Sequence, residues 1–190
     1  MKGQKLHSGD YGYINYKKKR QLCIVLIWAV IIGGVIAAGW LFTGTRMNVA
    51  TVVGIVLVLP AAKAAVSLFL VLGYRSGDKK QYEKIRSLTG EHSIVLADLI
   101  LTRYEGSMYI PIALIRGGNI FAFAPKQKTD EAIIRQYIGE SVKASGSTAV
   151  PCVDRDFNAF YQRLKKMPPV KAGPSKSDKA ICTDILSRAV

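Results

Sequence analysis

The sequence predicts a membrane protein in which a helical hairpin of two transmembrane helices carries a small α+β domain. The chain has 190 residues, of which 49% are hydrophobic, yet its formal net charge is +14. Its mean hydropathy is +0.18 because the apolar residues concentrate between positions 22 and 74. Beyond Arg75 the pattern changes to short amphipathic and β-rich segments. These features exclude an ordinary soluble protein, a disordered chain and a disulfide-stapled secreted module.

The first predicted span covers residues 22–42, which contain no charge and no proline. At about 1.5 Å per residue this run is about 30 Å long, as thick as the hydrocarbon core of a bilayer. A signal peptide is the alternative, since Lys17, Lys18, Lys19 and Arg20 could form its basic region. The run exceeds the usual apolar region of a signal peptide, and a second span follows at once. We therefore expect a retained anchor.

The second predicted span covers residues 47–74, after a connection of four residues that includes Arg46. So short a connection predicts two antiparallel neighbouring helices. Basic residues precede the first span and follow the second, from Arg75 onward, whereas the connection holds one. The positive-inside rule then places both termini in the cytoplasm, with the basic residues against an anionic inner leaflet.

Pro60 and Lys63 interrupt the second apolar run. Lys63 lies eleven residues, about 16 Å, from the end of that run, so the sequence predicts a cation near the middle of the bilayer. The lysine could snorkel, bind carbonyl groups that Pro60 leaves without donors, or follow a span that ends near Leu59. It could also serve a small oligomeric pore, an inter-subunit contact or a lipid site.

Small residues recur at four-residue spacing in both runs, as in Gly33/Ala37 and Ala50/Gly54. Such spacing lets helix backbones approach closely, either within the hairpin or in a homo-oligomer.

The soluble region, residues 75–167, predicts the order α-β-β-β-α-β-α. Asp78 predicts the start of a helix and Gly90 its end. The apolar run at 93–104 predicts a central strand. Gly117-Gly118 predicts a hairpin turn. Residues 1–21 form a basic N-terminal segment, and 168–190 a linker with a short C-terminal helix. The remaining predicted elements are strands at 108–115, 119–124 and 148–153 and helices starting at Thr129 and at Asp154 or Asp156.

This order resembles the restriction-endonuclease-like core, including nuclease-related domains of the PD-(D/E)xK type. Such nucleases need carboxylates on the second and third strands to hold a metal, and the matching segments here have none. Asp98 is the candidate buried carboxylate, and we interpret it as a structural group rather than a catalytic one. Glu91 and Lys126 are the other residues that such a site would need. We expect no metal and no cofactor, because no ligand spacing typical of such a site is present. We expect no nucleic-acid binding, because the basic residues are dispersed.

Residues 11–22 (YGYINYKKKRQL) and 60–66 (PAAKAAV) resemble an uncharacterised family of small two-span bacterial membrane proteins with a cytoplasmic α/β domain. The resemblance extends to about position 167. It implies a bacterial inner-membrane location and no known activity. We therefore expect a non-enzymatic membrane protein whose domain binds an unidentified protein or lipid, with a membrane-tethered degenerate nuclease and an oligomeric pore as alternatives.

Overall fold

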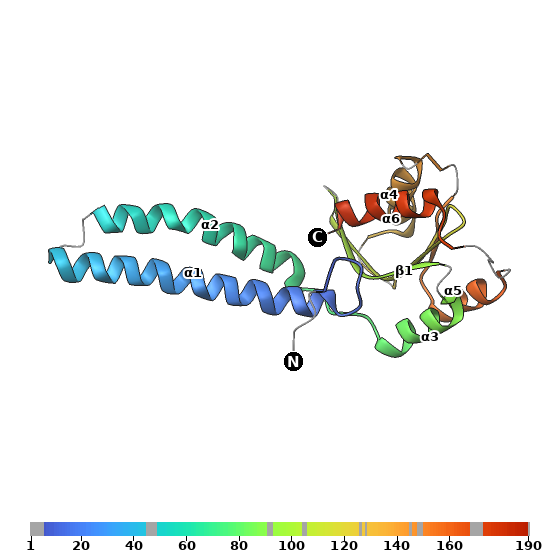
Figure 1. Ribbon diagram of the computed structural model, residues 1–190, viewed down its shortest axis with the longest axis horizontal. Helices are drawn as coiled ribbons and strands as arrows, with labels where there is room; N and C mark the ends of the chain where they lie inside the picture. Colours follow the sequence, from blue (N-terminus) through green and yellow to red (C-terminus); the bar gives the residue numbers. More distant parts are fainter. Residues whose placement is uncertain are drawn as a thin grey trace. The chain divides into compact units, whose positions relative to one another are not determined.

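The chain forms two compact units in the computed structural model (Figure 1). One unit is the helical segment Ile14–Tyr74. The other contains the described residues of Met1–Tyr13 and of Arg75–Val190, so the polypeptide leaves this unit and returns to it. The structure describes residues 6–44, 49–90, 93–103, 106–125, 127, 129–144, 146–147, 150–167 and 173–189.

The helical unit consists of two long apolar helices, α1 (Tyr13–Thr43) and α2 (Val49–Leu72). Both are long and apolar enough to cross a membrane. Helix α1 begins nine residues before the predicted span, so the basic stretch Lys17–Arg20 is helical rather than part of a separate segment. Helix α2 continues through Pro60 to Leu72 as one helix, and the alternative that the membrane span ends near Leu59 stays a prediction.

The second unit confirms the predicted order of helices and strands and contains the predicted short C-terminal helix. In α3 the Asp78 carboxylate accepts a hydrogen bond from the Lys80 N–H, and Gly90 ends the helix at a φ of 60°. The Asp156 carboxylate caps α5 in the same way. The elements are α3 (Lys79–Thr89), β1 (Ile94–Arg103), β2 (Gly106–Arg116), β3 (Asn119–Phe123), α4 (Glu131–Ala144), β4 (Cys152–Asp154), α5 (Phe157–Lys165) and α6 (Lys176–Arg188).

The four strands form one mixed sheet in the order β1-β2-β3-β4. Strands β1, β2 and β3 are antiparallel, whereas β4 pairs parallel to β3 after the α4 crossover. Gly117 and Gly118, both at positive φ, make the β2–β3 turn as predicted. The prediction that residues 93–104 form a central strand was wrong: β1 is the first strand of the sheet. Its faces are nevertheless buried, because helices cover both sides.

Helices cover the sheet on both faces (Figure 1). Helices α4 and α6 pack on one face, where Tyr137 and Ile181 join the larger apolar cluster. Helices α3 and α5 pack on the other, where Ile85 and Phe160 are fully buried. Helix α6 is thus part of the core, and the boundary expected at residue 168 lies inside this unit. The helical spacing of Tyr82, Ile85 and Leu88 predicts one buried stripe on α3, but Leu88 is exposed and Thr89 is buried.

Pro111 of β2 lies opposite Asp98 of β1, and these two residues do not pair although their neighbours on both sides do. The pairs on both sides keep the same register, so neither strand contains an inserted residue. A proline inside the predicted strand 108–115 is typical of a bulge or an edge position. The bulge is absent, and Asp98 instead adopts a φ of 53°. Because β3 pairs with β2 only from Ile112 onward, Pro111 has an edge position on that side. There the Gln127 amide takes the place of a strand: it accepts from the Tyr109 N–H at 2.8 Å and donates to the Tyr109 C=O at 3.0 Å.

Candidate binding groove

A buried carboxylate joins the two chain segments that lead into and out of the helical hairpin. Asp98 is 2% exposed, and its Oδ2 accepts a hydrogen bond from the Gly12 N–H at 2.8 Å. Its Oδ1 accepts from the Gly77 N–H at 3.0 Å. Gly12 directly precedes α1, and Gly77 follows α2 by five residues. We call Asp98 with these two amide groups the clasp.

Close packing around Gly77 favours glycine at this position of the clasp. A Cβ atom there would lie 3.0 Å from the Pro111 Cβ and 3.5 Å from the Tyr109 hydroxyl. Burial raises the pKa of Tyr109, and the negative charge of Asp98 raises it further. The phenol therefore stays neutral beside the clasp at physiological pH.

The N-terminal segment also pairs with the outer edge of β1. The Ala97 N–H donates to the Gly9 C=O at 2.7 Å, in an antiparallel bridge. Gly9 has a φ of 95°, and a Cβ atom there would lie 3.0 Å from the Leu96 and Leu186 side chains. This bridge and the clasp fix the segment at two points, and Tyr11 lies between them in sequence.

Tyr11 connects the N-terminal segment to α3. Its hydroxyl donates to the Gly77 C=O at 3.0 Å, and its ring stacks on Tyr82 with centroids 5.1 Å apart and an interplanar angle of 22°. Burial raises the pKa of Tyr11, and the charges of Asp98, Asp78 and Glu83 add to the rise. The hydroxyl thus remains a hydrogen-bond donor over the physiological range.

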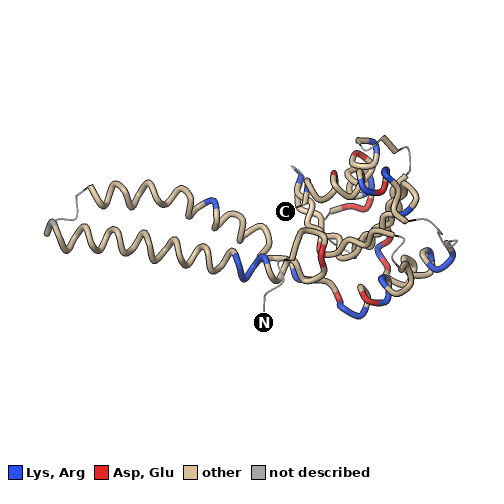
Figure 2. The backbone as a smooth tube through the Cα atoms, in the orientation of Figure 1, with Lys and Arg blue, Asp and Glu red and all other residues tan. Residues whose placement is uncertain are grey.

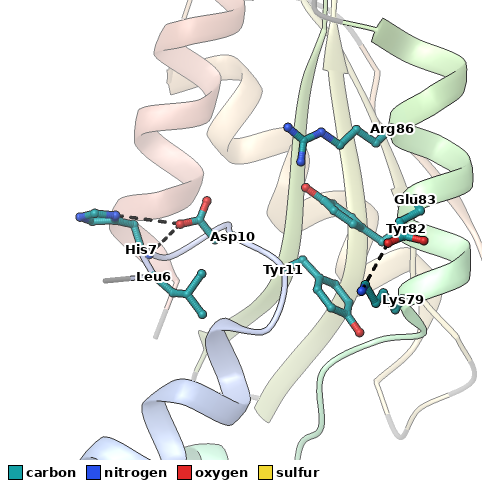
Figure 3. A pocket seen from close by; sticks show the side chains of 8 residues that line it. All are labelled: Leu6, His7, Asp10, Tyr11, Lys79, Tyr82, Glu83 and Arg86. Atoms are coloured by element: carbon teal, nitrogen blue, oxygen red, sulfur yellow. Dashed lines mark hydrogen bonds and ion pairs between the residues drawn. The ribbon is translucent and has the colours of Figure 1, made fainter. Parts of the chain in front are cut away.

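A groove of about 590 Å³ lies between the N-terminal segment and α3 (Figure 3). Helix α3 contributes residues spaced three or four apart, which places them on one side of the helix. The Tyr11 and Tyr82 rings lie side by side in Figure 3, with Arg86 and Lys79 at opposite ends of this aromatic surface. The lining residues are Leu6, His7, Asp10, Tyr11, Lys79, Tyr82, Glu83 and Arg86.

Of the four Asp, Glu, Lys and Arg side chains that line the groove, three have a hydrogen-bond or ion-pair partner among the described residues. Lys79 Nζ lies 3.6 Å from Glu83 Oε1, and the Asp10 carboxylate accepts a hydrogen bond from the His7 N–H at 2.8 Å. No described residue pairs with the Arg86 guanidinium. The groove therefore offers an exposed planar cation beside two stacked aromatic rings. This combination suits the anionic group of a partner molecule better than a cation.

The described residues that line the groove include no serine, threonine or cysteine, and His7 Nδ1 lies 3.9 Å from Asp10 Oδ2, beyond hydrogen-bond distance. Over the described ranges, no three His, Cys, Asp or Glu side chains form a group that could hold a metal ion. The nuclease alternative also required Glu91 and Lys126 near Asp98, and both lie outside the described residues. Arg46, Pro168 and Pro169, used for the predicted connection and linker, lie outside them as well. Strands β2 and β3 contain no carboxylate.

The predicted basic residues of α1 lie beside the C-terminal part of α2. Lys18 Nζ donates to the Leu72 C=O at 2.8 Å, and Gln21 Nε2 donates to Ser67 Oγ at 3.1 Å. Lys19 and Arg20 are exposed, and Lys17 is half-buried. In the described part of the hairpin, Figure 2 shows basic residues on this stretch of α1 and at one position of α2, and residues 14–74 contain no acidic residue. Arg75, in the other unit, is exposed.

The register of the hairpin changes the expected position of Lys63. Because Ser67 is level with Gln21, Lys63 is level with about Val25, only one helical turn from Gln21. The prediction counted the whole run to Tyr74 and so placed Lys63 about 16 Å deep. The last residues of that run instead lie beside the basic stretch. Lys63 is exposed, and its side chain makes no hydrogen bond or ion pair with a described residue, carbonyl groups near Pro60 included.

Two further carboxylates are buried that the sequence analysis did not identify. Asp178 is 3% exposed and accepts a hydrogen bond from the Gly118 N–H at 2.7 Å. It also completes a capping box with Ser175. The three-residue spacing from Ser175 to Asp178 is the sequence signal that could have indicated this helix start. Burial raises the pKa of Asp178, but the hydrogen bonds from Gly118 and Ser175 outweigh burial and lower it overall. Asp154 makes a bidentate ion pair with Arg163, both distances being 2.9 Å.

No protein-family model matches this chain, and comparisons with curated proteins and with solved structures likewise give no match. The expected relationship to a two-span bacterial family therefore stays a prediction, as does the restriction-endonuclease-like topology.

Proposed function

We propose that the chain is an integral membrane protein whose hairpin anchors a ligand-binding α/β domain at the membrane surface. Exposed apolar surface on the hairpin supports this most directly. Of the large hydrophobic side chains exposed among the described residues, all but Leu88 and Val150 lie on α1 and α2. Such a surface is unfavourable in water and favourable in lipid. The core helix of a soluble protein would bury these side chains instead.

The charge distribution supports an orientation with both termini in the cytoplasm. The inner membrane of a bacterium is the location that the resemblance of residues 11–22 and 60–66 implies. The basic stretch of α1 and the residues from Arg75 onward flank the same end of the antiparallel hairpin in sequence, while Arg46 is the only charge in the connection. Residues 75–190 contain 19 Lys and Arg against 12 Asp and Glu. This excess favours a position next to an anionic leaflet.

The groove supports a binding role for the domain rather than a catalytic one. It is built from the two segments that flank the hairpin in sequence, and the clasp holds these segments together. A ligand that reaches both walls would therefore bind across the clasp and stabilise it. Arg86 selects the ligand's anionic group, and the Tyr11–Tyr82 stack packs against its apolar or aromatic part.

Membrane insertion is tested by extraction and topology mapping of the full chain. After expression in a Gram-negative bacterium, we expect the protein to stay in the membrane pellet at alkaline pH. Tags at either terminus should be digested in inverted vesicles and protected in intact spheroplasts. Release into the soluble fraction, or digestion of either tag in spheroplasts, would contradict the proposal.

The groove is tested by hydrogen exchange of the full chain in detergent, with glycerol phosphate as the anionic probe. We expect the probe to slow exchange in residues 6–13 and 79–86. Arg86→Glu should weaken this protection at least tenfold, since it removes a charge-assisted contact and adds a repulsive charge. Lys80→Glu is the matched control, because Lys80 is an exposed cation of α3 that does not line the groove. Equal effects of the two variants would show general charge attraction instead of binding in the groove.

A further inference from the structure

We propose that Lys63 binds the phosphate group of an anionic phospholipid on the outer surface of the hairpin. This proposal rests on the membrane anchoring proposed above. It assigns a ligand to a cation whose side chain makes no hydrogen bond or ion pair with a described residue.

The charge inventory of the hairpin excludes a counter-ion from the hairpin itself. Residues 14–74 contain no Asp and no Glu, so neither α1 nor α2 can supply a carboxylate to Lys63. A second copy packed hairpin to hairpin would bring the same composition and therefore no carboxylate either. An ammonium group in an apolar environment needs a nearby anion or water. In a bilayer, lipid phosphate is the abundant anion.

The position of Lys63 along α2 brings lipid phosphate within its reach. Lys63 is one helical turn, about 6 Å, farther into the hairpin than Ser67 and its partner Gln21. A fully extended lysine side chain spans about 6 Å, and near a helix end it can turn against the N-terminal tilt of its Cα–Cβ bond to reach the headgroups. The ammonium group can therefore reach the level of Gln21, next to the basic stretch. At the depth of about 16 Å expected from the sequence, such a contact would be out of reach.

The surroundings of Lys63 point toward lipid and not toward the neighbouring helix. Leu59, Val66 and Leu70 lie four residues before, three after and seven after Lys63, on the same side of α2. Their exposed fractions are 72%, 59% and 40%. The methylene groups of Lys63 thus lie among side chains that would contact acyl chains. Only its ammonium group requires a polar partner.

Lipid retention by the full chain tests the proposal, measured by native mass spectrometry after reconstitution with phosphatidylglycerol and phosphatidylcholine. We expect Lys63→Leu to retain phosphatidylglycerol about fivefold more weakly, the factor for one lysine at an anionic surface. Lys63→Arg should retain it as the unchanged protein does. Lys143→Leu in α4 is the control for a cation outside the hairpin and should have no effect.

Two outcomes would overturn the lipid proposal. Lys63→Leu could retain phosphatidylglycerol as well as the unchanged protein, or it could lose both lipids equally. Alkaline extraction of the same samples separates this failure from failure of the membrane proposal. If the unchanged protein stays in the membrane while Lys63→Leu keeps its phosphatidylglycerol, only the role of Lys63 is refuted. If the unchanged protein is itself extracted, membrane anchoring is refuted.

Discussion

Replacing Asp98 should release the two segments that flank the hairpin while the sheet stays folded. The carboxylate is 2% exposed and accepts hydrogen bonds from the Gly12 and Gly77 N–H groups at 2.8 and 3.0 Å. A hydrogen bond to a charged group contributes about 1.5–3 kcal/mol, so the two together contribute about 3–6 kcal/mol. Asp98→Ala removes both and leaves two N–H groups without an acceptor.

Three variants separate hydrogen bonding from backbone strain at this position. Asp98→Asn keeps one acceptor oxygen and tolerates the φ of 53°, so we expect a cost of about 2 kcal/mol. Asp98→Gly loses both hydrogen bonds but adopts positive φ freely, whereas alanine at this φ costs about 1–2 kcal/mol. The glycine variant should therefore be less destabilised than the alanine variant.

Hydrogen exchange of the full chain in detergent measures these differences locally. A loss of about 2 kcal/mol corresponds to exchange about 30 times faster when local opening limits the rate. We expect this acceleration for Asp98→Asn in residues 6–13 and 75–78, with α4 unchanged as the internal control. Unchanged exchange in both segments would refute the role of the clasp. Equal acceleration throughout the domain would show that Asp98 supports the whole sheet instead.

Two further predictions concern the C-terminal helix and the hairpin. Asp178→Asn should weaken docking of α6 by about 1–2 kcal/mol at pH 7, because the amide keeps only one acceptor for the amides that Asp178 now binds. The folded-state pKa of Asp178 is lowered, so its contribution to stability is present above the unfolded pKa of about 3.9 and is lost as the pH falls through the folded pKa. The difference in thermal stability between the unchanged protein and Asp178→Asn should therefore be smaller at pH 3 than at pH 7. Gly54→Ala should separate α1 from α2, because a Cβ atom there would lie 2.8 Å from Ile36 Cγ1. Gly33→Ala is the control, since a Cβ atom at Gly33 would meet no atom of α2 within 4 Å. Disulfide cross-linking between α1 and α2 measures the separation, and an equal response to both substitutions would contradict this packing.

Local signals in the sequence were sufficient to predict the elements but not their neighbours. Asp78 and Gly90 mark the ends of α3, and Gly117-Gly118 marks the β2–β3 turn, because caps and turns depend on residues close in the chain. The place of β1 in the sheet depends on distant pairings instead. An apolar run shows that both faces are covered, and it does not show which strands lie beside it.

The candidate site was predictable only in part for the same reason. The apolar neighbours of Asp98 in sequence indicated its burial, but its partners are backbone N–H groups, which carry no side-chain signal. The lining residues of α3 have the spacing of any exposed helix surface. For Lys63, counting residues along one helix predicted a position about 16 Å from the end of the apolar run. The hydrogen bond between Gln21 and Ser67 places it only about one helical turn from the basic stretch of α1.

The clasp also means that the domain is interrupted by the hairpin rather than following it. Gly12 and Gly77 hydrogen-bond to the two oxygens of one carboxylate, so their amide nitrogens are only a few ångströms apart. Insertions are tolerated where the two ends of the inserted segment lie close together. The α/β domain can therefore be engineered without its anchor by excising the hairpin and joining the two ends with a short glycine bridge. The clasp also forms late in biosynthesis. The hairpin precedes β1 in the sequence, so it leaves the ribosome before β1 exists to receive the N-terminal segment.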